Sequence, residues 1–251
     1  CMLSTALIAE NIRRIEERIH AACLRSGRDA AEVKLMAVSK THPAEAIASG
    51  FAAGLRLFGE NRVQEFQQKL LDLSSLGVRV AGIAETPGDA AAVHLIGHLQ
   101  SNKTGRAAEV FSGVDTVDSL KLAERLDDGA KRLGRRLPVL VEIKLSDEEA
   151  KTGLEPESRE LADLLERLPE LGHIEMRGMM SVAPFDDNPE TARACFRRLR
   201  LLREELAARY SRLDFSELSM GMSGDFEIAI EEGSTLVRIG TAIFGARPKP
   251  V

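Results

Sequence analysis

The sequence predicts a (β/α)8 barrel of the TIM type. Three observations lead to this prediction. The chain has 251 residues, apolar strand-like runs alternate with amphipathic helix-like segments along nearly all of it, and the alternation repeats eight times. Strict alternation of strands and helices implies a parallel sheet. Eight such units in about 250 residues favour a closed barrel over an open doubly wound sheet. We therefore expect one domain, residues 2–251.

An extra helix precedes the repeating units, over residues 4–25. Its apolar residues recur at helical spacing: Leu7, Ile8, Ile12, Ile15 and Ile19. Ser4 is a suitable N-cap and Gly27 a suitable stop.

Eight predicted strands follow, each a short apolar run bounded by polar residues or glycine. They are residues 33–39, 55–59, 93–97, 111–117, 137–145, 174–182, 215–220 and 234–240. Helical patterns come after them, at residues 44–54, 61–73, 102–110, 119–134, 157–168, 189–210 and 225–233, with a last short one from 241. We interpret residues 77–92 as an insertion before the third strand.

Composition excludes several classes of protein. Hydrophobic residues make up 44% and charged residues 29%, with a net charge of −5 and three widely spaced cysteines. We expect neither a disulfide framework nor a metal site, and the absence of a basic run argues against nucleic-acid binding. No apolar run approaches the ~20 residues that span a bilayer, and the N-terminus lacks a signal-peptide layout. We expect a cytoplasmic monomer that does not associate with membranes.

In such barrels the site lies where the strands end, and phosphate is often held after strands seven and eight. Gly221, Ser223 and Gly224 follow the seventh predicted strand and lead into a helix, and Gly240 and Thr241 do the same after the eighth. Backbone N–H groups at helix starts, together with hydroxyl groups, bind anions. The alternative is ordinary turn chemistry and capping.

Lys40 ends the first predicted strand. A partly desolvated lysine has a lowered pKa, and its neutral amine can form a Schiff base with an aldehyde. The alternative for Lys40 is a solvated surface lysine. Other polar residues also lie at strand ends: Glu60, Asn61, His98, Gln100, Asp115, Asp118, Lys144 and Ser181.

Several segments resemble the YggS/PROSC family of pyridoxal phosphate homeostasis proteins, over nearly the whole chain. The matching motifs are LMAVSKTHPAEAI, LFGENRVQE, HLIGHLQSNK, VDS at 117–119, KTG at 151–153, RGMMSVAP and SMGMSGDFEIAIEEGSTLVRIGTAIFGAR. The resemblance implies a barrel similar to the N-terminal domain of alanine racemase. It also implies pyridoxal 5′-phosphate (PLP) as cofactor, held covalently as a Schiff base on Lys40.

The resemblance further implies roles for six more residues. Ser223, Gly224, Gly240 and Thr241 would surround the phosphate, Asn61 would lie near the ring, and Arg238 would face the pyridine nitrogen. The alternative for Arg238 is a structural ion pair with Glu231 or Glu232. Arg62 stands where the family motif usually has tyrosine, which leaves open what lines the solvent side of the cofactor.

The family resemblance implies intracellular PLP homeostasis, by buffering PLP or delivering it to apo PLP-dependent enzymes, with indirect effects on amino-acid and keto-acid balance. We expect no appreciable turnover, because the only tyrosine, Tyr210, is expected to pack at a helix end. One alternative is a weak PLP-dependent amino-acid racemase or lyase, with Lys40 as one base and His98, Lys103 or Lys144 as the other. Another is a partner-binding protein whose PLP reports cofactor status.

Overall fold

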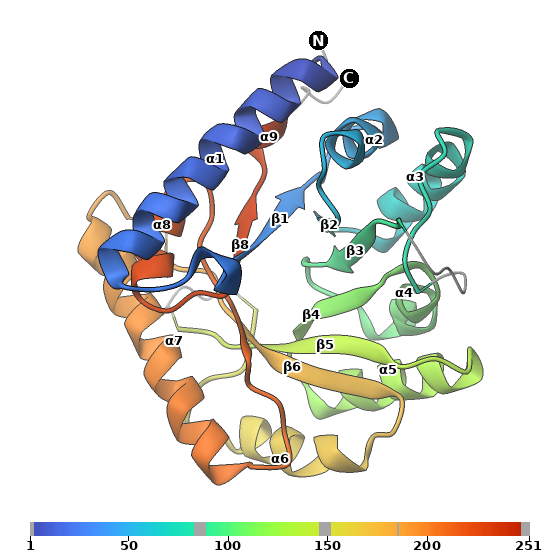
Figure 1. The fold of residues 1–251 in the computed structure, drawn as a ribbon. Coiled ribbons are helices and arrows are strands. Elements are labelled where there is room, and N and C mark those ends of the chain that lie inside the picture. Colours follow the sequence, from blue (N-terminus) through green and yellow to red (C-terminus); the bar gives the residue numbers. More distant parts are fainter. Residues whose placement is uncertain (1–2, 83–88, 146–151, 185, 247–251) are drawn as a thin grey trace.

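The computed structural model describes residues 3–82, 89–145, 152–184 and 186–246. Eight parallel strands close into a barrel, and each strand pairs with its neighbours in chain order until β8 meets β1. Helices form an outer ring around the barrel (Figure 1). The predicted (β/α)8 fold is confirmed.

The strands lie within the predicted runs or one residue outside them, and most are shorter. They are β1 (Lys34–Val38), β2 (Leu57–Glu60), β3 (Ala92–Leu95), β4 (Gly113–Val117), β5 (Leu137–Glu142), β6 (Ile174–Met180), β7 (Glu217–Ser219) and β8 (Leu236–Ile239). The α-helices are α1 (Thr5–Ser26), α2 (Ala44–Ala52), α3 (Val63–Ser75), α4 (Thr104–Val110), α5 (Leu120–Arg132), α6 (Arg159–Arg167), α7 (Pro189–Arg209), α8 (Phe226–Glu231) and α9 (Thr241–Phe244).

The extra helix α1 begins and ends as the sequence predicts. The backbone N–H of Leu7 donates to Ser4 Oγ at 3.3 Å, and Gly27 ends the helix with a left-handed φ of 67°. The helix covers the outside of the last two units, beside α8 and α9 (Figure 1). Asn11 Nδ2 donates to the carbonyl of Ile243 at 3.0 Å, so the first helix is fastened to the last.

The strand register brings the ends of β1 and β8 to the same edge. Ala37 of β1 lies beside Ile239 of β8 on one side and beside Phe58 of β2 on the other. Residues that follow β1 therefore leave the sheet next to those that follow β8. The carboxyl end of a TIM barrel is where active sites form, so this edge positions Lys40 near Gly240 and Thr241.

The apolar core has two parts of unequal size. The larger part lies between the strands and the helix ring and includes Phe58, Phe66, Phe111 and Phe226, all fully buried. The smaller part consists of Met36, Leu140, Met180 and Leu236. This second cluster packs with Leu57, Ile96 and Val182, two of which also line the cavity described below.

The segment before β3 contains an isolated bridge. Val80 forms an isolated parallel bridge with Ala91, while residues 83–88 lie outside the described part of the chain. The predicted insertion at 77–92 therefore stays a prediction.

Candidate functional site

A cavity of about 540 Å³ opens at the carboxyl ends of the strands. Six of the seven predicted site residues line it together: Lys40, Ser223, Gly224, Arg238, Gly240 and Thr241. They come from the segments that follow β1, β7 and β8, and from β8 itself. Val38, Ile96 and Val182 form an apolar wall. The volume lies within the usual range of about 300–1,000 Å³ for small-molecule sites.

Lys40 is half-buried and follows a strand whose last residues are buried. The residue before it, Ser39, is fully buried, and its N–H donates to the carbonyl of Gly59 at 3.0 Å. The backbone is therefore fixed where the side chain enters the cavity. His42, which the sequence reasoning missed, also lines the cavity and is 8% exposed.

The loop between β7 and α8 is a tight turn whose glycines leave part of the backbone accessible. The N–H of Met222 donates to Asp225 Oδ1 at 2.6 Å, which tightens the turn. A Cβ on Gly221 would lie 2.6 Å from Ala229 Cβ, and its φ is +97°, so this position requires glycine. A Cβ on Gly224 would meet nothing within 4 Å. A ligand can thus approach the backbone at Gly224 closely.

Arg238 is 4% exposed and lines the same cavity. Its guanidinium donates to Ser219 Oγ at 2.6 Å and to the carbonyl of Ser181 at 2.9 Å. Both acceptors are neutral. Burial lowers the pKa of Arg238, and the charges of Asp115, Asp225 and Glu142 oppose that shift. The guanidinium remains a hydrogen-bond donor only, because arginine does not lose its proton in proteins.

The alternative of an ion pair between Arg238 and Glu231 or Glu232 is wrong. Glu231 pairs with Arg193 at 2.8 Å and Glu232 with Arg197 at 2.9 Å, both on α7. Glu231 ends α8 and Glu232 follows it, and both face α7 on the outside of the barrel. Arg238 lies in β8, and its guanidinium donates to Ser219 and Ser181 instead.

Asn61 is the predicted site residue that does not join the others. It is half-buried at the end of β2 and is absent from the described residues that line the cavity. Instead, its carbonyl packs against the backbone of Gly97, where an added Cβ would lie 2.3 Å from Asn61 O. The neighbouring Arg62 is exposed at the start of α3.

Other strand-end candidates lie elsewhere. His98 pairs with Asp118 at 3.4 Å, and Lys144 belongs to a separate small hollow beside Arg198. Neither His98, Lys103 nor Lys144 is among the described residues that line the cavity. Burial raises the pKa of Glu142, although the Thr152 hydroxyl donates to its carboxylate at 2.9 Å and opposes the shift.

Asp115 was expected near the carboxyl end of its strand, and it lies at the opposite mouth. β4 begins at Gly113, so Asp115 is only its third residue. It lines a second cavity, of about 780 Å³, together with Lys34, His94, Arg177 and Glu217. His94 Nδ1 and Asp115 Oδ1 are 2.8 Å apart. The amino-terminal face of such barrels is usually concerned with stability.

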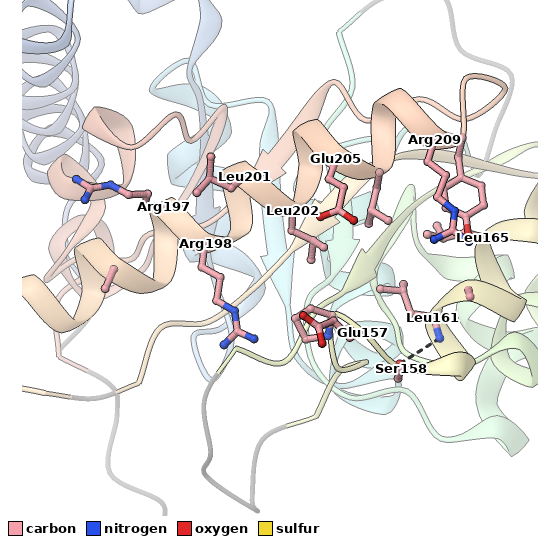
Figure 2. Close-up of a pocket in the computed structure, with 15 residues that line it drawn as sticks. Glu157, Ser158, Leu161, Leu165, Arg197, Arg198, Leu201, Leu202, Glu205 and Arg209 are labelled. Atoms are coloured by element: carbon pink, nitrogen blue, oxygen red, sulfur yellow. Dashed lines mark hydrogen bonds between the residues drawn. The ribbon is translucent and has the colours of Figure 1, made fainter.

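A third hollow, of about 590 Å³, is a groove between α6 and α7 on the outer surface. Figure 2 shows leucines such as Leu161, Leu165 and Leu202 along it, with Arg198 and Arg209 at its sides. Tyr210 also lines this groove, with the guanidinium of Arg209 5.3 Å from its ring centre. The only tyrosine is thus a packing residue at a helix end, as predicted.

Two absences hold for the described residues. No group of three or more His, Cys, Asp or Glu side chains there could hold a metal ion. Within that same part of the chain, no helix combines the length and the apolar character needed to cross a bilayer.

Comparisons with known proteins give consistent results. The family model described as the alanine racemase N-terminal domain matches residues 4–248. The pyridoxal phosphate homeostasis protein of Haemophilus influenzae is 40% identical, over 96% of this chain and 96% of its own. That of Escherichia coli strain K12 is 41% identical over 96% and 97%. The solved structure of PipY from Synechococcus elongatus with PLP bound is 40% identical, with a TM-score of 0.77, and covers 92% of this chain and 100% of its own.

Proposed function

This chain belongs to the family of pyridoxal phosphate homeostasis proteins, and from that premise we propose that it binds PLP covalently on Lys40 in the cavity at the carboxyl ends of the strands. We propose further that it buffers PLP and delivers it to apo enzymes. The observation that carries the proposal is the cavity itself, which joins a lysine, a buried arginine and two glycine-containing loops.

The residues present fit PLP at three points. Gly224 leaves open space beside its backbone, where a phosphate oxygen can approach. Ser223 and Thr241 add hydroxyl groups to the same wall. Arg238 can only donate hydrogen bonds, so its natural partner is an unprotonated ring nitrogen, which is an acceptor. PLP supplies an aldehyde carbon that an amine can attack.

Lys40 would supply that amine. Its Nζ bonds to the aldehyde carbon, the carbonyl oxygen leaves as water, and the ligand becomes covalently held. The apolar wall of Val38, Ile96 and Val182 keeps one side of this region dry. The same bond exchanges when a free amine attacks the carbon and Lys40 leaves, which is the step that a carrier needs.

Two features favour a carrier over an enzyme. Arg238 stays protonated and would keep the ring nitrogen unprotonated, which makes the ring a weaker electron sink than a pyridinium with a carboxylate partner. The chain has one tyrosine, and it lies in the groove between α6 and α7. No tyrosine is therefore available in the cavity to act as an opposing base.

The test has two parts. The purified protein is treated with borohydride and its peptides are mapped by mass, and we expect the pyridoxyl adduct on Lys40. A label on a different lysine would contradict the assignment. Holo-protein is then mixed with an apo PLP enzyme, which should regain activity, while a panel of amino acids is assayed for turnover. A kcat in the ordinary range of roughly 1–10³ s⁻¹ would establish the racemase or lyase alternative instead.

A further inference from the structure

A network of charged groups, buried at Lys69 and Glu60 and partly exposed at Glu65, contacts the backbone that carries Lys40. Lys69 of α3 donates from Nζ to three oxygens: Glu60 Oε1 at 2.8 Å, Glu65 Oε1 at 2.8 Å and the carbonyl of Ser39 at 3.1 Å. The side chains of Lys69 and Glu60 are 9% and 0% exposed. A lysine ammonium has three donors, so all of those on Lys69 are used.

The network holds both chain neighbours of Lys40. On one side, Ser39 Oγ donates to Glu60 Oε1 at 2.7 Å, and the Ser39 carbonyl accepts from Lys69. On the other side, the N–H of Thr41 donates to Glu65 Oε1 at 2.6 Å. Every one of these partners belongs to the next unit of the barrel, at the end of β2 or on α3.

Thr41 has a backbone conformation that its side chain disfavours. Its φ is +64°, and it is the only residue other than glycine with a positive φ in the described part of the chain. A β-branched residue in the left-handed region is an outlier that persists only where the surroundings impose it. The hydrogen bond to Glu65 restrains the Thr41 N–H.

Glu65 is suited to that task because it stays ionised. Burial raises the pKa of Glu65, but hydrogen bonds from Lys69 and from the Thr41 N–H, together with the charges of Lys69 and Arg62, lower it below its ordinary value. A charged acceptor forms a stronger bond to a backbone N–H than a neutral one does.

Stability alone is a poor reason for such a network. Buried ion pairs can often be replaced by apolar side chains of similar volume with little loss of stability. This network instead ends on the two peptide units that flank one lysine, and one of them is strained. Strain of this kind is typical of functional sites.

We propose that Glu65 and Lys69 are positioning residues, which hold Thr41 in its left-handed conformation and so fix the direction in which Lys40 presents its amine. This inference rests on the proposed function, since it concerns the bond between Lys40 and PLP. It predicts that loss of the Glu65 contact weakens covalent attachment and leaves the phosphate loops intact.

The experiment compares two ligands on four proteins. PLP can bond to Lys40, whereas pyridoxamine 5′-phosphate lacks the aldehyde and can use only the non-covalent contacts. Glu65→Ala removes the acceptor for the Thr41 N–H and leaves Lys69 paired with Glu60. Glu65→Gln keeps an acceptor oxygen. Glu65→Ala with Thr41→Gly removes the acceptor and also the strain, because glycine adopts a positive φ freely. Lys69→Met is less suitable, because it leaves two carboxylates without their cation.

We expect Glu65→Ala to bind PLP about tenfold more weakly, the factor that release of a strained backbone would give, with unchanged affinity for pyridoxamine 5′-phosphate. Glu65→Gln should stay near the parent protein, and Thr41→Gly should restore PLP binding in the Glu65→Ala background. Equal losses for both ligands, no loss for either, or no restoration by Thr41→Gly would overturn the inference. If borohydride fails to label Lys40 in the parent protein, the proposed function falls as well, and the two failures are thereby distinguished.

Discussion

The two mouths of the barrel differ in how their charges are satisfied. At the amino-terminal mouth, the charged groups that line the cavity have opposite charges beside them. Lys34 pairs with Glu217, His94 with Asp115, and Arg177 with Glu175 at 3.1 Å. At the carboxyl-terminal mouth, buried Arg238 donates to a serine hydroxyl and a backbone carbonyl, and the described residues place no carboxylate within 4.0 Å of it.

The difference shows why cavity size is a poor guide to function here. The amino-terminal cavity is larger, at about 780 Å³ against about 540 Å³. The cations that line it already have carboxylate partners, although Asp115 Oδ2 has no hydrogen-bond partner among the described residues. A ligand entering the smaller cavity finds a buried cation whose partners are neutral. A buried cation whose direct hydrogen-bond partners are neutral is therefore a better reason than volume to propose a site for a polar ligand.

The largest expected effect is on covalent PLP binding, and it should distinguish two lysines at opposite ends of β1. Lys34 begins β1 and Lys40 follows its end, so they belong to opposite mouths. Lys40→Ala should abolish PLP that borohydride can trap, because no other lysine is among the described residues that line the cavity. Lys34→Ala serves as the matched control and should retain full trapping. Mass spectrometry of the reduced proteins measures both, and comparable losses in the two variants would mean that the mouths are not functionally distinct.

A smaller effect is expected at the loops that follow β7 and β8, which we propose hold the phosphate. Ser223→Ala and Thr241→Ala should each weaken PLP retention, by about 1.5–3 kcal/mol if each hydroxyl donates to a charged oxygen. Pyridoxal, which lacks the phosphate, should bind far more weakly than PLP to the parent protein. Equilibrium dialysis with both ligands gives the affinities. Equal retention of pyridoxal and PLP would show that the phosphate group does not contribute to binding at this site.

The smallest effect on PLP is expected at the amino-terminal mouth, where Asp115→Asn should alter stability and leave PLP retention unchanged. Burial lowers the pKa of His94, but the charge and hydrogen bond of Asp115 more than offset this and raise it above its ordinary value. The ion pair of protonated His94 with Asp115 therefore stabilises the fold fully at pH values below the pKa of histidine in the unfolded chain, about 6.5. This stabilisation is lost as the pH rises through the higher pKa that His94 has in the folded protein.

The stability difference between the parent protein and Asp115→Asn should therefore be largest below about pH 6.5 and shrink at alkaline pH. We expect a maximum of about 1.5–3 kcal/mol, as for a hydrogen bond to a charged group. Urea unfolding over a range of pH measures it. A difference that grows with pH would show that Asp115 does not stabilise the protonated form of His94.

Local sequence patterns were sufficient for the elements and for the loops that follow β7 and β8. The spacing of isoleucines predicts α1. Its caps, Ser4 and Gly27, are recognisable from residue type and position in the sequence, because capping depends on the local backbone. Gly221 and Gly224 likewise reveal a turn. These features depend on near neighbours in the chain, so no knowledge of the fold is required.

The position of a residue along the barrel axis, and contacts between residues distant in sequence, were not predictable in this way. Alternation shows which face of a strand a residue occupies but not which end of the barrel it reaches, so Asp115 was expected at the wrong mouth. Glu65 and Lys69 are spaced i, i+4 on α3, which is the usual pattern of an exposed helical pair. Only the packed barrel shows that Lys69 is buried beside Ser39.

The hydrogen bond between α1 and α9 also bears on the order in which parts of the chain fold. The contact between Asn11 and Ile243 spans 232 residues, and closure of the barrel needs β1 to pair with β8. Contacts so distant in sequence form late, because the entropy of loop closure must be overcome first. During synthesis Lys40 emerges about 200 residues before Gly240 and Thr241. A nascent chain thus carries the lysine long before it has the loop that follows β8, and the complete cavity can form only after that loop has been synthesised.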